Sequence, residues 1–267
     1  MKTFLFIVAG ALVFFSCKKD GGSGKKMMLS KVFIDNLLSE EYIYSADKKP
    51  LRRNSYSTSL GQSTFAGFRL YGYTNGQLTE KLQYNKFNQL SAKHVLSYNA
   101  SNQLSRIDAY GADDEIDLYF LFEYGADQQI SQINTYSVAP VKKSGELLLE
   151  YDPDGNLLSF KRYYLSGTWI LFDSTTFTAA DRSLPDHWDY YEMYPLDFPV
   201  EKTFLQMPAA SMHYYLAGGP PSKSNHTYSN KVYNSAGYLT SQHYKLEADN
   251  AITITTFDYE LRYEYVE

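Results

Sequence analysis

Apolar and polar residues alternate along most of the chain after residue 28, in short runs that end at polar turns. The alternation is clearest near the C-terminus, where every second position is apolar: Phe257, Tyr259, Leu261, Tyr263 and Tyr265. The positions between them are charged: Asp258, Glu260, Arg262 and Glu264. Because successive residues of a strand point to opposite faces, this segment predicts a strand with one packed and one wet face. We expect this charged strand to protect an exposed edge of the sheet.

A short unit recurs along the chain: an aromatic residue, a polar turn rich in Asn, Asp and Gly, then an aliphatic residue. The closest copies are Tyr84–Leu90, Tyr98–Leu104, Tyr124–Ile130, Tyr151–Leu157 and Tyr233–Leu239, and looser ones are Tyr44–Leu51, Tyr73–Leu78 and Phe177–Leu184. Asn, Asp and Gly tolerate the left-handed backbone that tight turns need. The aromatic and aliphatic residues can then face each other across a hairpin. Each copy therefore predicts a hairpin, and copies about 26 residues apart correspond to two strands and two turns.

The regular spacing of these hairpins predicts the fold class. At about 13 residues for one strand and its turn, the folded part holds about 16–18 strands. We predict an all-β fold, an antiparallel up-and-down meander of these hairpin repeats, rolled into an open or nearly closed barrel-like sheet. The 26 tyrosines fit this prediction, because aromatic side chains suit a pleated, half-buried surface.

The stretch Tyr151-Asp152-Pro153-Asp154-Gly155-Asn156-Leu157 resembles the Y-D-x-x-G-x-L unit of YD repeats of the Rhs and teneurin type. The chain is also similar to small YD-repeat lipoproteins of Bacteroidota, most of which have no assigned function. The resemblance covers residues 29–267 and implies hairpins wound into one long sheet. The chain is too short to form the toxin-enclosing shell of large Rhs proteins, so that activity is not carried over.

The N-terminus predicts export and a lipid anchor. Residues 1–16 combine Lys2 with an uncharged apolar run from Phe4 to Phe15, the layout of a signal peptide. The sequence Phe14-Phe15-Ser16-Cys17 resembles the lipobox of bacterial lipoproteins, which implies lipid attachment at Cys17. Residues 17–28 then form a lipidated flexible tether, and residues 29–267 a single β-repeat domain. We expect an outer-membrane lipoprotein of the cell envelope, facing the periplasm or exposed on the surface.

Composition excludes several classes of function. The formal charge of -5 argues against nucleic-acid binding, which requires a concentrated basic face. The chain contains no nucleophile elbow, phosphate loop, dinucleotide fingerprint or paired-cysteine motif, so we expect no enzyme activity, cofactor or metal. The acidic run from Asp113 to Asp117 is typical of a solvated loop or a weak cation site. A membrane-spanning barrel needs uncharged lipid-facing positions, whereas Lys161 and Arg162 charge both faces of one strand.

One stretch suggests a ligand site. If residues 186–194 are extended, one face carries Trp188, Tyr190, Glu192 and Tyr194, and Trp169 could lie on a nearby strand. Aromatic rings beside a carboxylate are typical of sugar-binding surfaces, although the same rings could belong to the core. Our leading hypothesis is a non-enzymatic envelope lipoprotein that binds a glycan or an envelope protein. The alternatives are a structural or assembly role without a small ligand, and a glycosidase-like enzyme.

Overall fold

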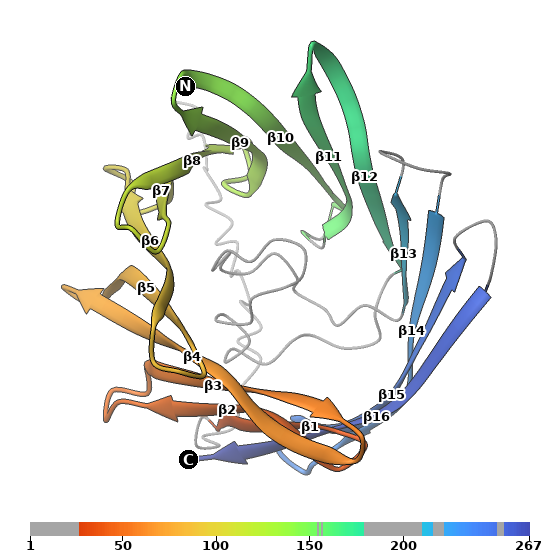
Figure 1. Cartoon of the computed structure of the whole chain (residues 1–267). Helices are drawn as coiled ribbons and strands as arrows, with labels where there is room; N and C mark the ends of the chain where they lie inside the picture. Colours follow the sequence, from red (N-terminus) through yellow and green to blue (C-terminus); the bar gives the residue numbers. More distant parts are fainter. Residues whose placement is uncertain (1–26, 154, 156, 179–209, 216–221, 250–253) are drawn as a thin grey trace, which may run out of the picture.

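The structure, a computed structural model, describes residues 27–153, 155, 157–178, 210–215, 222–249 and 254–267. Within these ranges the chain forms sixteen strands (Figure 1). They are β1 (Met28–Ile34), β2 (Leu37–Tyr44), β3 (Pro50–Ser59), β4 (Gln62–Thr74), β5 (Gln77–Asn85), β6 (Leu90–Tyr98), β7 (Leu104–Tyr110), β8 (Ile116–Tyr124), β9 (Ile130–Val138), β10 (Val141–Tyr151), β11 (Leu157–Ser166), β12 (Thr168–Thr178), β13 (Ala210–Tyr215), β14 (Ser222–Tyr233), β15 (Leu239–Asp249) and β16 (Ile254–Val266).

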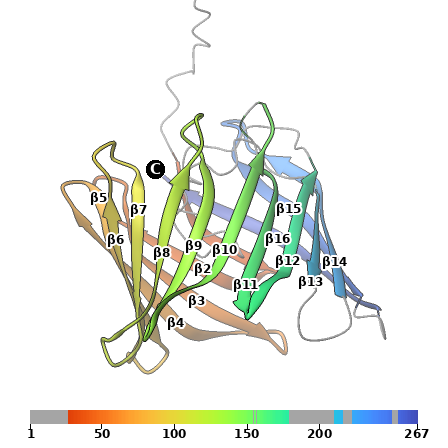
Figure 2. The ribbon, with the colours of Figure 1, turned by 90° about the horizontal axis from the view of Figure 1, so that it is seen from above.

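The strands form one antiparallel up-and-down sheet in which each strand pairs with its neighbours in sequence. β1 also pairs with β16, from Met28 opposite Val266 to Ile34 opposite Leu261, and this pairing closes the sheet into a barrel. Figure 2 shows the strands wrapping around the barrel from a second direction. The predicted all-β meander is confirmed, with a strand number inside the predicted range. The expectation that β16 is an exposed edge is wrong, because β1 and β15 pair with it on either side.

The predicted aromatic–aliphatic pairs are confirmed as cross-strand partners: Tyr73 with Leu78, Tyr84 with Leu90, Tyr98 with Leu104, Tyr124 with Ile130, Tyr151 with Leu157 and Tyr233 with Leu239. Tyr44 is an exception, since it lies opposite Pro50 rather than Leu51. A register shift accompanies these pairs, so one extra residue enters the ladder beside the turn. The copy that ends at Leu184 lies partly outside the described residues.

Seven connections share one five-residue turn, in which the fourth residue has a positive φ. In six of them the first residue donates its N–H to the carbonyl of the fifth, as Asn99 does to Gln103. The fourth residues are Lys48, Asn88, Asn102, Asp114, Gln128, Gly155 and Gly237. Three of the turns begin with Asn, whose side-chain oxygen accepts two backbone N–H groups, as Asn99 does from Ser101 and Gln103. These side-chain bonds fix the turn locally, which is why Asn recurs there.

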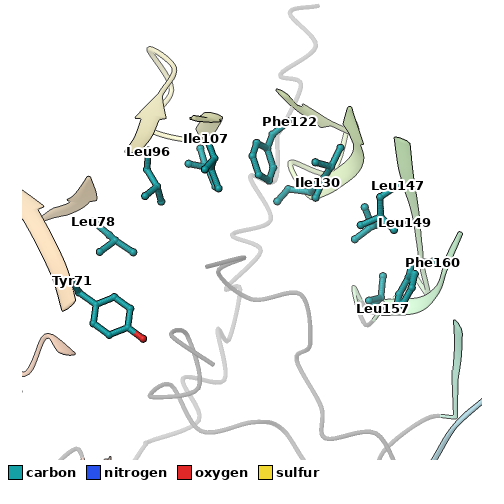
Figure 3. Packing of buried hydrophobic residues seen from close by; sticks show 12 residues of the cluster. Tyr71, Leu78, Leu96, Ile107, Phe122, Ile130, Leu147, Leu149, Leu157 and Phe160 are labelled. Atoms are coloured by element: carbon teal, nitrogen blue, oxygen red, sulfur yellow. The ribbon is translucent and has the colours of Figure 1, made fainter. Parts of the chain in front are cut away.

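The apolar side chains gather on the inner face of the barrel. Figure 3 shows Tyr71, Ile107, Leu147 and Phe160 among the buried residues that point into the ring from separate strands. A second cluster joins the closing strands, with Val32 of β1 buried beside residues of β2, β15 and β16. The packed face predicted from the alternation is therefore the inner one.

The outer face carries ion pairs on several strands on both sides of the barrel. Arg106 and Asp108 flank the inward-pointing Ile107, so they lie on the outer face, where their side chains are 2.6 Å apart. Similar outer pairs join Lys143 to Glu146, Lys161 to Glu150, Lys245 to Glu247 and Arg262 to Glu264. As the alternation predicted, the charged positions of β16 face outward. On β11, Lys161 faces outward and Arg162 inward.

The two ends of the barrel differ. We call the end that holds Met28 and Val266 the terminal end, and the opposite end the far end. At the terminal end, hydrogen bonds join each turn to the next: Lys49 to the carbonyl of Gly76, Gln77 to Asn102, Gln103 to Gln128, and Gln129 to the carbonyl of Gly155. These bonds hold five successive hairpins in one polar rim.

The repeated tyrosines add a second set of bonds at the terminal end. In five cases a tyrosine hydroxyl donates to a backbone carbonyl near the start of the preceding strand. The bonds are Tyr44 to Leu29, Tyr73 to Pro50, Tyr98 to Leu78, Tyr124 to Leu104 and Tyr265 to Leu239, at 2.5–3.0 Å. Tyr73, Tyr98 and Tyr124 therefore connect their hairpins to the preceding ones, in addition to pairing across their own hairpins.

Candidate functional site

Of the predicted site residues, the structure describes only Trp169. Cys17, Trp188, Tyr190, Glu192 and Tyr194 lie outside the described residues, so their predicted roles stay predictions. Trp169 is the second residue of β12 and is 44% exposed, on the outer face near the far end. The ammonium of Lys143 lies 5.0 Å from the centre of the indole ring.

A row of outward-facing side chains leads across the sheet toward Trp169. Register places Asp108 opposite Tyr119, Tyr119 opposite Tyr136, and Tyr136 opposite Lys143. The two tyrosine rings stack with centroids 4.9 Å apart and planes 2° from parallel. The guanidinium of Arg106 lies 4.3 Å from the centre of the Tyr119 ring. Because Arg106 and Tyr136 both stack on Tyr119, the indole of Trp169 is the most accessible ring of the row.

The row could hold a polar, ring-shaped ligand by two kinds of contact. An exposed indole face can stack on the C–H groups of a sugar, and flanking charges can bond to its hydroxyls. Asp108 and Glu146 supply carboxylates, although each already pairs with a neighbouring cation. Sequence reasoning selected Trp169 but missed the rest of the row, because its members come from four strands whose register is not written in any local motif.

The inner face holds buried charges near β2 and β3. Arg53 forms an ion pair with Glu40, and its guanidinium lies 5.9 Å from the centre of the Tyr42 ring. Burial works against the charge on Arg53, but Tyr42 and Glu40 outweigh it and raise the pKa of Arg53 above its ordinary value. The guanidinium therefore stays charged inside the barrel and binds these neighbours, as a structural group would.

A second inner polar group lies on β14 and β15. The Nε2 atom of His226 is 3.0 Å from the hydroxyl of Ser224, and its Nδ1 atom is 2.8 Å from the hydroxyl of Tyr244. Burial lowers the pKa of His226, so the imidazole is neutral at neutral pH. A neutral histidine between two hydroxyls can pass a proton between them. The alternation Ser224-x-His226-x-Tyr228 was the available signal, since it places these residues on one face.

A hollow of about 570 Å³ lies where β1 meets β16 and β2. Its lining mixes tyrosine rings with Lys31, Glu41 and Glu264. Glu41 already accepts a hydrogen bond from Asn54, and Glu264 pairs with Arg262. Both carboxylates are therefore engaged by their own neighbours, which leaves few groups for a ligand.

The acidic run predicted as a solvated loop forms the β7–β8 turn, in which Gly111 donates to the carbonyl of Glu115. No set of three or more His, Cys, Asp or Glu side chains in the described ranges is arranged to hold a metal ion. Those ranges also contain no helix with the length and hydrophobicity needed to cross a bilayer.

No protein family profile and no curated protein sequence matches the chain. Among solved structures, a porin-like protein from Bacteroides uniformis is similar with a TM-score of 0.54 at 11% identity, over 85% of this chain and 90% of that one. A porin-like protein from Bacteroides vulgatus matches at a TM-score of 0.39, with 11% identity over 90% and 99% of the two chains. TcdB2-TccC3 matches at 0.31, with 13% identity over 82% of this chain and 13% of that one. The first likeness shows a shared fold, and the other two are too weak to extend it.

Proposed function

We propose that this chain is a lipid-anchored protein of the cell envelope, attached through Cys17, with a non-enzymatic binding or interaction role. The supporting observation is the charged outer face of the barrel. Ion pairs such as Arg106–Asp108 and Arg262–Glu264 lie between inward-facing positions, so water rather than acyl chains surrounds them. A barrel with such an outer face does not insert into a bilayer by itself. Attachment to the membrane would therefore depend on the predicted lipid on Cys17.

Metabolic labelling with a clickable fatty acid tests the anchor. The native chain should incorporate the label and sediment with membranes. The Cys17→Ala variant should lose the label. A label that persists in this variant, or a native chain without label, would disprove the anchor. Protease shaving of intact cells then separates a surface-exposed from a periplasmic barrel.

The repeat supports assignment to the YD type. The shared five-residue turn, the confirmed aromatic–aliphatic pairs and the tyrosine-to-carbonyl bonds all recur with the period of the sequence motif. A sheet held together by contacts between its own hairpins is compatible with the alternative structural or assembly role.

A second candidate function, carbohydrate binding, is favoured by the exposed Trp169 and the polar row beside it. A glycan array with the native chain and Trp169→Ala tests it, because loss of the indole should abolish stacking. Phe87→Ala is the matched control, since Phe87 is also an exposed ring but lies in the β5–β6 turn. Binding to no glycan would favour the structural role, and binding that survives Trp169→Ala would exclude this row.

A further inference from the structure

Exposed apolar side chains occur at both ends of the barrel, but the most exposed ones lie at one end. Among the described residues, the four most exposed large hydrophobic side chains are Leu60, Ile254, Phe87 and Val141, at 101%, 74%, 71% and 70%. All four lie at the far end, in turns or on the first residue after a connection. The described turn residues of the terminal end include no exposed large hydrophobic side chain. We call these four residues the apolar tips.

Two of the tips depart from what their turns require. Leu60 has a φ of 52°, a left-handed conformation that Asp35 and Asn75 adopt in the equivalent position of other two-residue turns. A leucine there costs free energy relative to Asn and gains no burial in return. Phe87 is the third residue of a five-residue turn, and its counterparts in other copies include Asp47 and Ser101. Turn geometry therefore explains neither side chain.

Aromatic rings paired with lysines lie beside the tips. Lys143 lies over Trp169, and Lys223 lies 5.9 Å from the ring centre of Tyr214. The tip Phe87 is itself paired with a lysine, since Lys86 lies 5.0 Å from its ring centre. Trp and Tyr favour the boundary between headgroups and acyl chains, and lysine can extend its ammonium to the headgroups. Apolar tips followed by aromatic–lysine pairs are thus arranged as a shallow membrane contact.

From this arrangement, we propose that the far end of the barrel binds the surface of a lipid bilayer by inserting the apolar tips. The tips lie at the ends of different strands or in different turns, so they form no continuous groove for a protein partner. A bilayer accepts isolated apolar side chains wherever they meet its surface. Asp113, Asp114 and Glu115 lie at the same end, so basic charge does not dominate, and the contact is apolar rather than electrostatic.

This contact is separate from the lipid anchor. The anchor would join the chain at the terminal end, opposite the apolar tips. The tether from Cys17 to Met28 spans about 40 Å at most when fully extended. The proposal is therefore tested without the lipid, on a chain that begins at Lys18. That chain keeps every described strand and the β1–β16 pairing, and circular dichroism checks its fold.

The test is flotation with vesicles of phosphatidylcholine and phosphatidylethanolamine. The Lys18–Glu267 chain should float with vesicles, at low and at high salt alike. Replacing Leu60, Phe87, Val141 and Ile254 together by Ser should lower the partition coefficient at least tenfold. The matched control replaces Ile43, Leu51, Leu158 and Val232 by Ser, because these are 41–53% exposed but lie near the terminal end. It should bind as the parent chain does.

A milder variant protects the test against misfolding. Leu60→Asn with Phe87→Asp uses residues that other copies of the two turns already carry, and it should still lose several-fold in partition. Failure of the parent chain to float, equal loss in the control variant, or binding that salt removes would each overturn the proposal. Cross-linking of the tips to an envelope protein without vesicle binding would overturn it in favour of a protein partner.

Discussion

Removing a single hydroxyl from a repeat tyrosine should weaken the whole barrel. The hydroxyl of Tyr98 donates to the carbonyl of Leu78 at 2.8 Å, and that of Tyr124 donates to the carbonyl of Leu104 at 2.8 Å. Both bonds are partly buried, and each joins two hairpins. Tyr98→Phe keeps the ring and its packing but removes the donor. A net hydrogen bond contributes about 1 kcal/mol, within a range of roughly 0.5–1.5 kcal/mol.

The size of the effect can be stated for this chain. For a domain of this length, about 1 kcal/mol lowers Tm by about 2–4 °C. Tyr98→Phe should therefore lower Tm by that amount, and the double variant with Tyr124→Phe by roughly twice as much if the sites are independent. Differential scanning fluorimetry on matched preparations measures both shifts.

Tyr136→Phe is the control for this experiment. Tyr136 stacks on Tyr119 on the outer face, and the described structure shows no hydrogen bond from its hydroxyl. Its Tm should stay within about 1 °C of the native value, as expected for a surface substitution. If Tyr98→Phe and Tyr136→Phe shift Tm equally, the bonds between hairpins contribute nothing measurable, and the repeat tyrosines do not stabilise the barrel through their hydroxyls.

Three further substitutions test other parts of the fold. Gly67→Ala should destabilise by about 1–3 kcal/mol, because its Cβ would collide with the backbone carbonyl oxygen of Tyr84; an unchanged denaturant midpoint would contradict this. Burial lowers the folded-state pKa of His226, so its contribution to stability is complete above the unfolded pKa of about 6.5 and declines as the pH falls through the folded value. His226→Gln should flatten that part of a Tm–pH profile, and overlapping profiles would argue against it. Leu60→Asn should raise stability by about 0.5–1 kcal/mol in thermal melts, since Asn tolerates the left-handed backbone; a lower Tm would show that Leu60 packs in solution.

The sequence predicted the hairpins well because each is encoded locally. An aromatic residue, an Asn-rich turn and an aliphatic residue fix both the reversal and the register, so Tyr98–Leu104 could be paired from the chain alone. The β-bulges beside the turns could not be predicted from the same local motif. The extra residue near Leu78 moves that side chain inward while Glu80 faces outward, whereas strict alternation would give both residues the same face.

Closure of the sheet and the candidate site were harder to predict, because both depend on contacts between distant strands. Nothing near Met28 or Val266 indicates that they pair, and the charges of β16 suggested an edge instead. The row beside Trp169 likewise joins residues from β7 to β12 that become neighbours only through successive registers. Alternation gives the face of each residue, but only the accumulated register gives its neighbours.

In a repeat of this kind, the copies can be compared with one another to separate residues that the fold requires from residues that serve a function. Because the turns share one backbone geometry, a residue type that recurs at an equivalent position is explained by that geometry, as Asn is at the start of the turns. A residue that departs from its counterparts, gains no burial and adopts an unfavourable conformation needs another explanation. Leu60 meets all three conditions, and Phe87 meets the first two. The departures therefore indicate function more specifically than the abundant tyrosines, whose bonds and pairings the fold itself requires.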